Sequence, residues 1–173
     1  MMEGAASEAA SLAGTQKLGK LIALYDSNRI SIEGDTDITF KEDVAMRFKA
    51  QNWQVIKVDL VENPDNVAML SNAIKKAQKE TKKPSIIICK TKIGYGTPLE
   101  GSHKCHGAPL GAENLQKTKE RFGWTCAPFE VPAEVFEHTA KAGRRGAKKE
   151  REWKAMFAEY EKKYPELAKA YKA

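Results

Sequence analysis

Residues 21–28, Leu-Ile-Ala-Leu-Tyr-Asp-Ser-Asn, join a continuous apolar run to a short polar turn. Apolar runs of strand length are typical of parallel strands that are covered on both faces. We therefore expect Leu21–Tyr25 to form a buried strand that is closed by Asp26, Ser27 and Asn28. Ligands of open parallel sheets bind beyond the carboxyl ends of the strands, so this polar turn is a candidate binding element.

The segments that follow alternate between helical and strand patterns. Apolar residues recur at helical spacing in residues 42–50 and 66–80, residues 53–58 alternate as in a strand, and residues 85–90 form another apolar run. Strand, helix, strand, helix, strand is the order of a parallel α/β unit. The sequence thus predicts an α/β fold in which helices cover both faces of a parallel sheet.

An alanine-rich segment precedes the first strand. Residues 4–16 are expected to form a tightly packed helix that ends near Gly14 and Gly19. Its small residues indicate burial, and an isolated buried carboxylate needs a partner. Glu8 is therefore a more notable acid than Glu3, and solvated surface charge is the alternative interpretation for both.

The remainder of the chain divides into a loop and a charged, helical tail. Residues 92–111 hold five glycines and two prolines, and loops of this length in a compact domain are functional or disordered. Helices are expected at residues 112–122, then at 132–142 and at 147–163. We place a boundary near Phe129, which gives an α/β domain over residues 1–130 and a helical region over residues 131–173.

Composition excludes several classes of protein. The 173 residues are 30% charged with a mean hydropathy of -0.55, and no apolar run approaches the ~20 residues of a membrane span. No secretory signal begins the sequence, which favours a cytosolic protein. The tail carries 11 Lys and Arg against 7 Asp and Glu. It has no aromatic platform for nucleic acid, so a solvated helix face is the better interpretation.

Two segments contain residues suited to chemistry. The turn at Asn28 offers oxygen ligands to a hard cation such as Mg²⁺, although turns rich in Asp and Asn mostly serve only the backbone. In the glycine-rich loop, His103, Lys104 and His106 are suited to binding a phosphate. Zinc is a weaker alternative because a fourth ligand is lacking beside Cys105, and an unliganded surface loop remains possible.

Several ordered motifs resemble the transketolase family. The segment MMEGAASEAASLAGTQKLGKLIALYDSNRISIEG is similar to the helix, strand and cofactor turn of that family's diphosphate-binding domain. CKTKIGYG and GSHKCHGAPLG are similar to a later loop, and APFEVP with the charged helices resembles the exit from the domain. The resemblance covers essentially all 173 residues and implies the family's thiamine-diphosphate-binding fold.

The resemblance also implies a cofactor site. In this family a divalent metal, Mg²⁺ or another cation such as Ca²⁺, holds thiamine diphosphate, and Asn28 and the carbonyl of Ile30 match two of its ligands. Ile32 and Ile93 match apolar positions near the thiazolium ring. His106 matches the histidine that touches the diphosphate and the substrate, and His103 matches a second substrate contact. Glu3 and Glu8 match an acidic pair that links two cofactors across a homodimer.

Departures from the family limit what this chain is expected to do alone. The Gly-Asp-Gly motif, which supplies a metal-binding aspartate, would lie just before Met1, so the sequence resembles a fragment. The complete family member would transfer a two-carbon ketol unit between sugar phosphates, as a homodimer or with a complementary subunit. The isolated chain is expected to be inactive. The alternatives are a related thiamine enzyme such as dihydroxyacetone synthase and a non-catalytic binding module.

Overall fold

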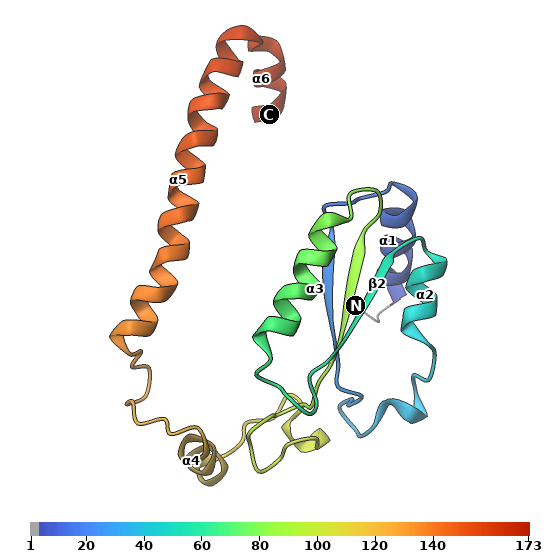
Figure 1. Ribbon diagram of the computed structural model, residues 1–173, viewed down its shortest axis with the longest axis vertical. Coiled ribbons are helices and arrows are strands. Elements are labelled where there is room, and N and C mark those ends of the chain that lie inside the picture. Colours follow the sequence, from blue (N-terminus) through green and yellow to red (C-terminus); the bar gives the residue numbers. More distant parts are fainter. Residues whose placement is uncertain (1–3) are drawn as a thin grey trace. The chain divides into compact units, whose positions relative to one another are not determined.

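A computed structural model describes residues 4–173, which form two compact units that divide between Gly123 and Trp124. The first unit is built on a three-stranded parallel sheet with the order β1-β3-β2 (Figure 1). Its strands are β1 (Ile22–Ser27), β2 (Gln54–Asp59) and β3 (Ser85–Lys90). The predicted parallel sheet is confirmed.

Helices cover both faces of this sheet, as the sequence predicts. Figure 1 shows α3 (Val67–Lys79) on one side and α1 (Gly4–Thr15) with α2 (Val44–Ala50) on the other. The central strand β3 faces both layers, and its neighbouring residues Ile86 and Ile87 are fully buried. Ile86 packs with α1 and α2 and Ile87 packs with α3, which explains the continuous apolar run of this strand.

Side-chain caps set where two of these helices begin. Asp43 accepts a 3.0 Å hydrogen bond from the amide of Met46 at the start of α2, and this bond lowers the pKa of its carboxyl group. Asn66 accepts one of 2.9 Å from the amide of Met69 at the start of α3. Both residues lie just outside their helices, so the helices begin slightly later than predicted.

The end of α1 differs from the expectation based on its glycines. The amide of Leu18 donates to the carbonyl of Ala13 at 3.1 Å, and that of Lys17 donates to Gly14 at 3.2 Å. This pair of bonds is a Schellman motif, with Lys17 in the left-handed position at a φ of 54°. Gly14 therefore lies inside the helix and does not terminate it.

Loops and short helices gather at the carboxyl ends of the strands. A 3₁₀ turn, η1 (Thr36–Ile38), lies between β1 and α2, and a second, η2 (His103–Cys105), lies in the loop that follows β3. The helix α4 (Ala112–Arg121) closes that loop, close to the predicted bounds. The end of the sheet that holds Ser27, Asp59 and Lys90 is thus covered by connecting segments.

The second unit is a helical hairpin and corrects one prediction. A single helix, α5 (Ala133–Lys163), replaces the two helices expected at 132–142 and 147–163, and α6 (Pro165–Lys172) follows it. Gly143 and Gly146 lie within α5, because a glycine costs a helix only about 1 kcal/mol and no proline interrupts the segment. No helix in the part of the chain that the structure describes is long and apolar enough to cross a membrane.

Candidate functional site

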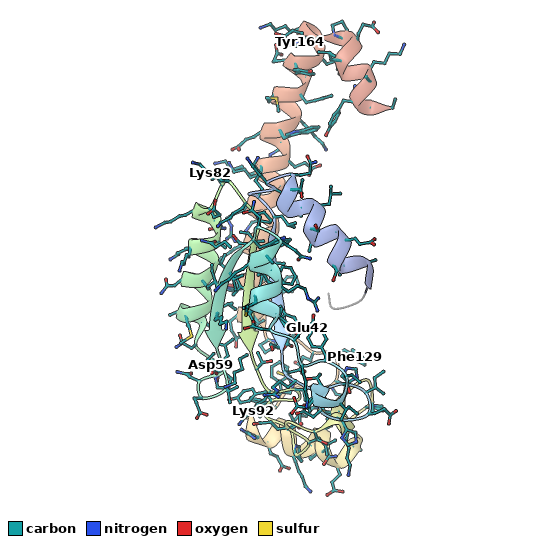
Figure 2. All side chains as sticks on the ribbon, turned by 90° about the vertical axis from the view of Figure 1, so that its right-hand side faces the viewer. Glu42, Asp59, Lys82, Lys92, Phe129 and Tyr164 are labelled. Carbon is teal, nitrogen blue, oxygen red and sulfur yellow. The ribbon has the colours of Figure 1, made fainter. Side chains whose placement is uncertain are left out.

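A pocket of about 850 Å³ opens at the carboxyl end of β1. Its lining comes from residues 25–31, from parts of residues 36–44 and from His106. In Figure 2, Asp59 and Lys92 mark this end of the sheet and Lys82 marks the opposite end. The pocket thus occupies the place where ligands of open parallel sheets are expected.

The turn after β1 brings two oxygen donors to the pocket. The side-chain oxygen of Asn28 accepts a 3.0 Å hydrogen bond from the amide of Ile30. Arg29, between them, has a φ of 61°, the left-handed region that reverses the chain within one residue. Among the described residues, no hydrogen bond reaches the carbonyl oxygen of Ile30. One lone pair of Asn28 Oδ1 and this carbonyl therefore remain for a ligand.

A small hairpin holds this turn in place. Ile30 and Asp35 form an antiparallel bridge, and the amide of Thr36 donates a 2.9 Å hydrogen bond to the carbonyl of Arg29. The guanidinium of Arg29 also pairs with Asp37, whose hydrogen bond and charge raise the pKa of Arg29. The backbone around Asn28 is consequently fixed by contacts on both sides.

His106 enters the pocket from the loop after β3. Its backbone amide donates a 2.9 Å hydrogen bond to the carbonyl of His103, which closes the turn η2. The ring atom Nδ1 is buried, and no hydrogen-bond partner for it exists among residues 4–173. Buried polar atoms normally have partners, so this ring nitrogen is an exception in a residue that lines the pocket.

The structure thus places three of the predicted site residues in one pocket and leaves three others outside it. Asn28, Ile30 and His106 line one pocket, whereas the side chains of Ile32, Ile93 and His103 do not. Ile32 is exposed at the tip of the hairpin, and His103 is exposed on η2.

The acidic pair proposed on the first helix is only partly described. Glu3 lies outside the described residues. Glu8 is exposed, so the burial expected for it is wrong for the chain by itself. Only one face of α1 packs on the sheet, through Ala10 and Ala13, and Glu8 does not lie on that face.

Sequence reasoning missed the other wall of the pocket. Residues 36–44 contribute Thr36, Asp37, Lys41 and Glu42 to the lining. The sequence feature that could have indicated this wall is the segment GDTDITFKED, which is rich in Asp and Thr and lies between the first strand and the next helix. With Asp26 and Arg29 also present, the pocket carries both signs of charge.

A metal ion would have to rely on donors other than a cluster of charged side chains. Within residues 4–173, no three His, Cys, Asp or Glu side chains gather in a way that could hold a metal ion. The donors on this wall are a neutral amide and a backbone carbonyl, which are hard oxygen ligands suited to Mg²⁺ or Ca²⁺. The residues present therefore fit a cation that binds phosphate, and His106 fits a phosphate or sugar oxygen.

Comparison with known proteins gives the family. The profile described as "Transketolase, thiamine diphosphate binding domain" matches residues 1–173. The transketolase of Bacillus subtilis (strain 168) is 52% identical over 171 residues, which are 97% of this chain and 25% of that protein. Transketolase 1 of Escherichia coli (strain K12) is 47% identical over 169 residues, with the same two coverages.

Solved structures agree with the fold. Transketolase from Leishmania mexicana superposes with a TM-score of 0.90 at 32% identity, over 98% of this chain and 25% of that one. Transketolase from Pichia stipitis in complex with sedoheptulose-7-phosphate gives a TM-score of 0.88 at 40% identity, over 96% of this chain and 25% of that one. This chain spans about a quarter of the length of these relatives. It belongs to the family of the thiamine diphosphate binding domain of transketolase.

Proposed function

We propose that the pocket binds the diphosphate end of thiamine diphosphate through a divalent cation. We further propose that the protein to which this chain belongs transfers a two-carbon ketol unit between sugar phosphates. The observation that carries the first proposal is that Asn28, Ile30 and His106 line one pocket at the end of a parallel sheet. Family membership over the whole chain supports the second.

Asn28 and Ile30 would hold the cation, Mg²⁺ or Ca²⁺, by oxygen atoms that carry no net charge. Two phosphate groups bring several negative charges, so neutral ligands add coordination without adding repulsion. The hydrogen bond from the Ile30 amide orients the Asn28 side chain and leaves a lone pair of its oxygen free. The hairpin contacts of Arg29 keep these two donors at a fixed spacing.

His106 would contact a phosphate oxygen or the ketol end of the substrate. A neutral imidazole has one nitrogen that donates and one that accepts, and the buried Nδ1 lacks a partner among the described residues. A rotation of the imidazole would let a ligand oxygen in the pocket supply one. His103 is a proposed second substrate contact, and Ile32 and Ile93 are proposed apolar contacts of the cofactor ring, although none of the three lines the pocket in this chain.

Bound thiamine diphosphate supplies the carbanion-stabilising chemistry of such a transfer, and the protein supplies position and charge. Glu8 is exposed on α1 and, with Glu3, is proposed to meet a second copy of the protein in a homodimer. A complementary subunit is the other partner that would complete the site. Structures of the Pichia stipitis relative in complex with sedoheptulose-7-phosphate and with fructose-6-phosphate support sugar phosphates as substrates.

Calorimetric titration of the 173-residue chain with thiamine diphosphate and Mg²⁺ tests the cofactor proposal. Asn28→Ala and His106→Ala are each expected to weaken binding by about tenfold, the effect of losing one good polar contact. Asn72→Ala on α3 and His138→Ala on α5 are the matched controls, since both residues are exposed and lie outside the pocket. Equal affinities for all five proteins would contradict the assignment.

The transfer activity has a separate test. The isolated chain is expected to show no ketol transfer, and activity is expected to return only when the remaining domains of a transketolase are supplied. If the wild-type chain fails to bind the cofactor even with those domains present, a non-catalytic binding module becomes the better description. Substrate preference in the complemented protein would distinguish transketolase from dihydroxyacetone synthase.

A further inference from the structure

A cluster outside the pocket is centred on Glu100, in the loop after β3. One of its carboxylate oxygens accepts a 2.9 Å hydrogen bond from the backbone amide of Gly96. The same carboxylate lies 3.6 Å from the ammonium of Lys92 and 3.7 Å from the guanidinium of Arg121. Glu100 thus joins the start of the loop, its middle and the last turn of α4.

Packing reinforces this junction. A Cβ at Gly96 would lie 2.1 Å from the ring of Phe122, so only glycine lets that ring approach so closely. Phe122 also meets Tyr95 edge to face, at 6.1 Å between ring centroids. Arg121 lies over the ring of Tyr95 at 5.6 Å. The end of α4 is therefore docked on the turn that begins the loop.

Further contacts connect this turn to the residue before His106. The amide of Gly101 donates a 2.8 Å hydrogen bond to the carbonyl of Ile93, which closes the segment between them. The thiol of Cys105 fills the space beside Gly94, where a Cβ would lie 2.7 Å from the sulfur. A change in the turn at residues 93–101 would consequently move η2 and His106 with it.

We propose that Glu100 is a positioning residue for His106: it fastens α4 to the start of the loop and so holds the imidazole in the pocket. This inference goes beyond the proposed function and rests on it only in giving His106 a ligand to bind. Loss of the carboxylate leaves two cations without their anion and the Gly96 amide without its acceptor. Segment 92–111 would then open more often, while the sheet remains folded.

Hydrogen exchange in the 173-residue chain tests the proposal without any cofactor. The amides of Gly101 and His106 report on the loop, and the amide of Ile87 in β3 reports on the sheet. Glu100→Gln keeps an acceptor for Gly96 and loses the charge, whereas Glu100→Ala loses both. Exchange at the two loop amides is expected to rise about tenfold in Glu100→Ala and less in Glu100→Gln, with Ile87 unchanged.

A matched control uses the other ion pair of α4. Glu113 pairs with Lys117 at 2.6 Å on the same helix, and its side chain forms no hydrogen bond or ion pair with residues 92–111 among the described residues. Glu113→Gln should therefore leave the loop amides as in the wild type. A merely structural role for Glu100 would raise exchange at Ile87 as well, and this result, or unchanged loop amides in Glu100→Ala, would overturn the proposal.

A pair of glycine variants gives an independent test of the contact between α4 and the loop. Gly96 and Gly101 both have positive φ, 83° and 75°, but a Cβ at Gly101 meets open space. Gly96→Ala is expected to expose the loop amides more than Gly101→Ala, because only the former displaces Phe122. Titration with thiamine diphosphate and Mg²⁺ then measures the consequence for binding. If the wild-type chain does not bind even when the remaining domains of a transketolase are supplied, the proposed function fails, whereas the exchange data still decide the role of Glu100.

Discussion

The indole Nε1–H of Trp53 donates a buried 2.8 Å hydrogen bond to the carbonyl oxygen of Ala10. Trp53 directly precedes β2, and Ala10 lies within α1, far from it in the sequence. The indole ring also meets Phe48 of α2 edge to face, at 5.2 Å between centroids. One side chain thus joins both helices of this layer to the sheet that carries the pocket.

Replacement of Trp53 by phenylalanine is expected to lower the free energy of unfolding of the first unit by about 1–3 kcal/mol. The variant loses the hydrogen bond to Ala10 and part of the buried ring while it stays apolar. Urea unfolding followed by circular dichroism measures the change. Trp124→Phe is the control, since Trp124 is 45% exposed and its replacement should change little. Equal effects of the two replacements would contradict the structural role given to Trp53.

Gly14 should respond to alanine in the opposite way from an ordinary helical glycine. A Cβ there would lie 1.8 Å from the carbonyl oxygen of Gln51, so Gly14→Ala is expected to destabilise the first unit by about 1–3 kcal/mol. In α5, Gly143 has open space, and Gly143→Ala is expected to stabilise its helix by up to about 1 kcal/mol. Thermal unfolding of both variants measures whether each change raises or lowers the stability. A change in the same direction for both would refute the packing argument.

The sequence predicts the strands and helices of the first unit well because the spacing of its apolar residues indicates which positions are buried. The run Ser85–Lys90 is the central strand to the residue, and α3 lies within one residue of its predicted bounds. Both elements bury a regular set of side chains. Asn28 and His106 are likewise found in one pocket, because parallel strands deliver the residues that follow them to the same edge.

The parts that sequence reasoning missed depend on contacts distant in the chain. Gly14 is a residue type that often ends helices, but here it lies in the helix because a side chain would collide with the carbonyl oxygen of Gln51. The local sequence pattern does not reveal this distant contact. The helix instead ends at Thr15, and the left-handed position that follows it is occupied by Lys17, a residue type with no strong preference for that conformation. The part of the pocket wall at residues 36–41 has no apolar period, so the local sequence does not indicate where it lies.

Replacement of Lys17 is expected to stabilise the chain because Lys17 has a left-handed backbone conformation. Its φ of 54° is strained for a residue with a Cβ, and Gly is the residue normally found at this point of a Schellman motif. Lys17→Gly is expected to raise the free energy of unfolding by up to about 1 kcal/mol, after the extra chain entropy of glycine is subtracted. Lys20→Gly is the control, because Lys20 has no positive φ and should gain nothing. Chemical unfolding of the two variants distinguishes them.

Burial should separate the three thiols in their reactivity. Cys89 is 7% exposed in β3, and burial, with a smaller effect from the charge of Asp26, raises the pKa of its thiol. Cys105 and Cys126 are partly exposed. Because the thiolate is the reactive form, the native chain is expected to react with iodoacetamide at pH 8 at Cys105 and Cys126 first. Peptide mass spectrometry measures each rate, and fast labelling of Cys89 in the folded chain would contradict its placement.

The junction at Glu100 should weaken in acid. Its pKa is lowered first by the hydrogen bond from the Gly96 amide and then by the charges of Lys92 and Arg121. A depressed folded pKa means that the stabilisation is present above the unfolded value of about 4.3 and is lost as the pH falls through the folded value. The ratio of loop-amide exchange between Glu100→Gln and the wild type cancels the intrinsic pH dependence of exchange. It should therefore be large at pH 6 and fall toward one as the pH drops through the lowered pKa of Glu100. Asp43 and Asp59 also have lowered pKa values and destabilise the chain in acid, but they do so equally in both proteins. A ratio that stays constant over this range would show that the carboxylate charge of Glu100 does not hold the loop.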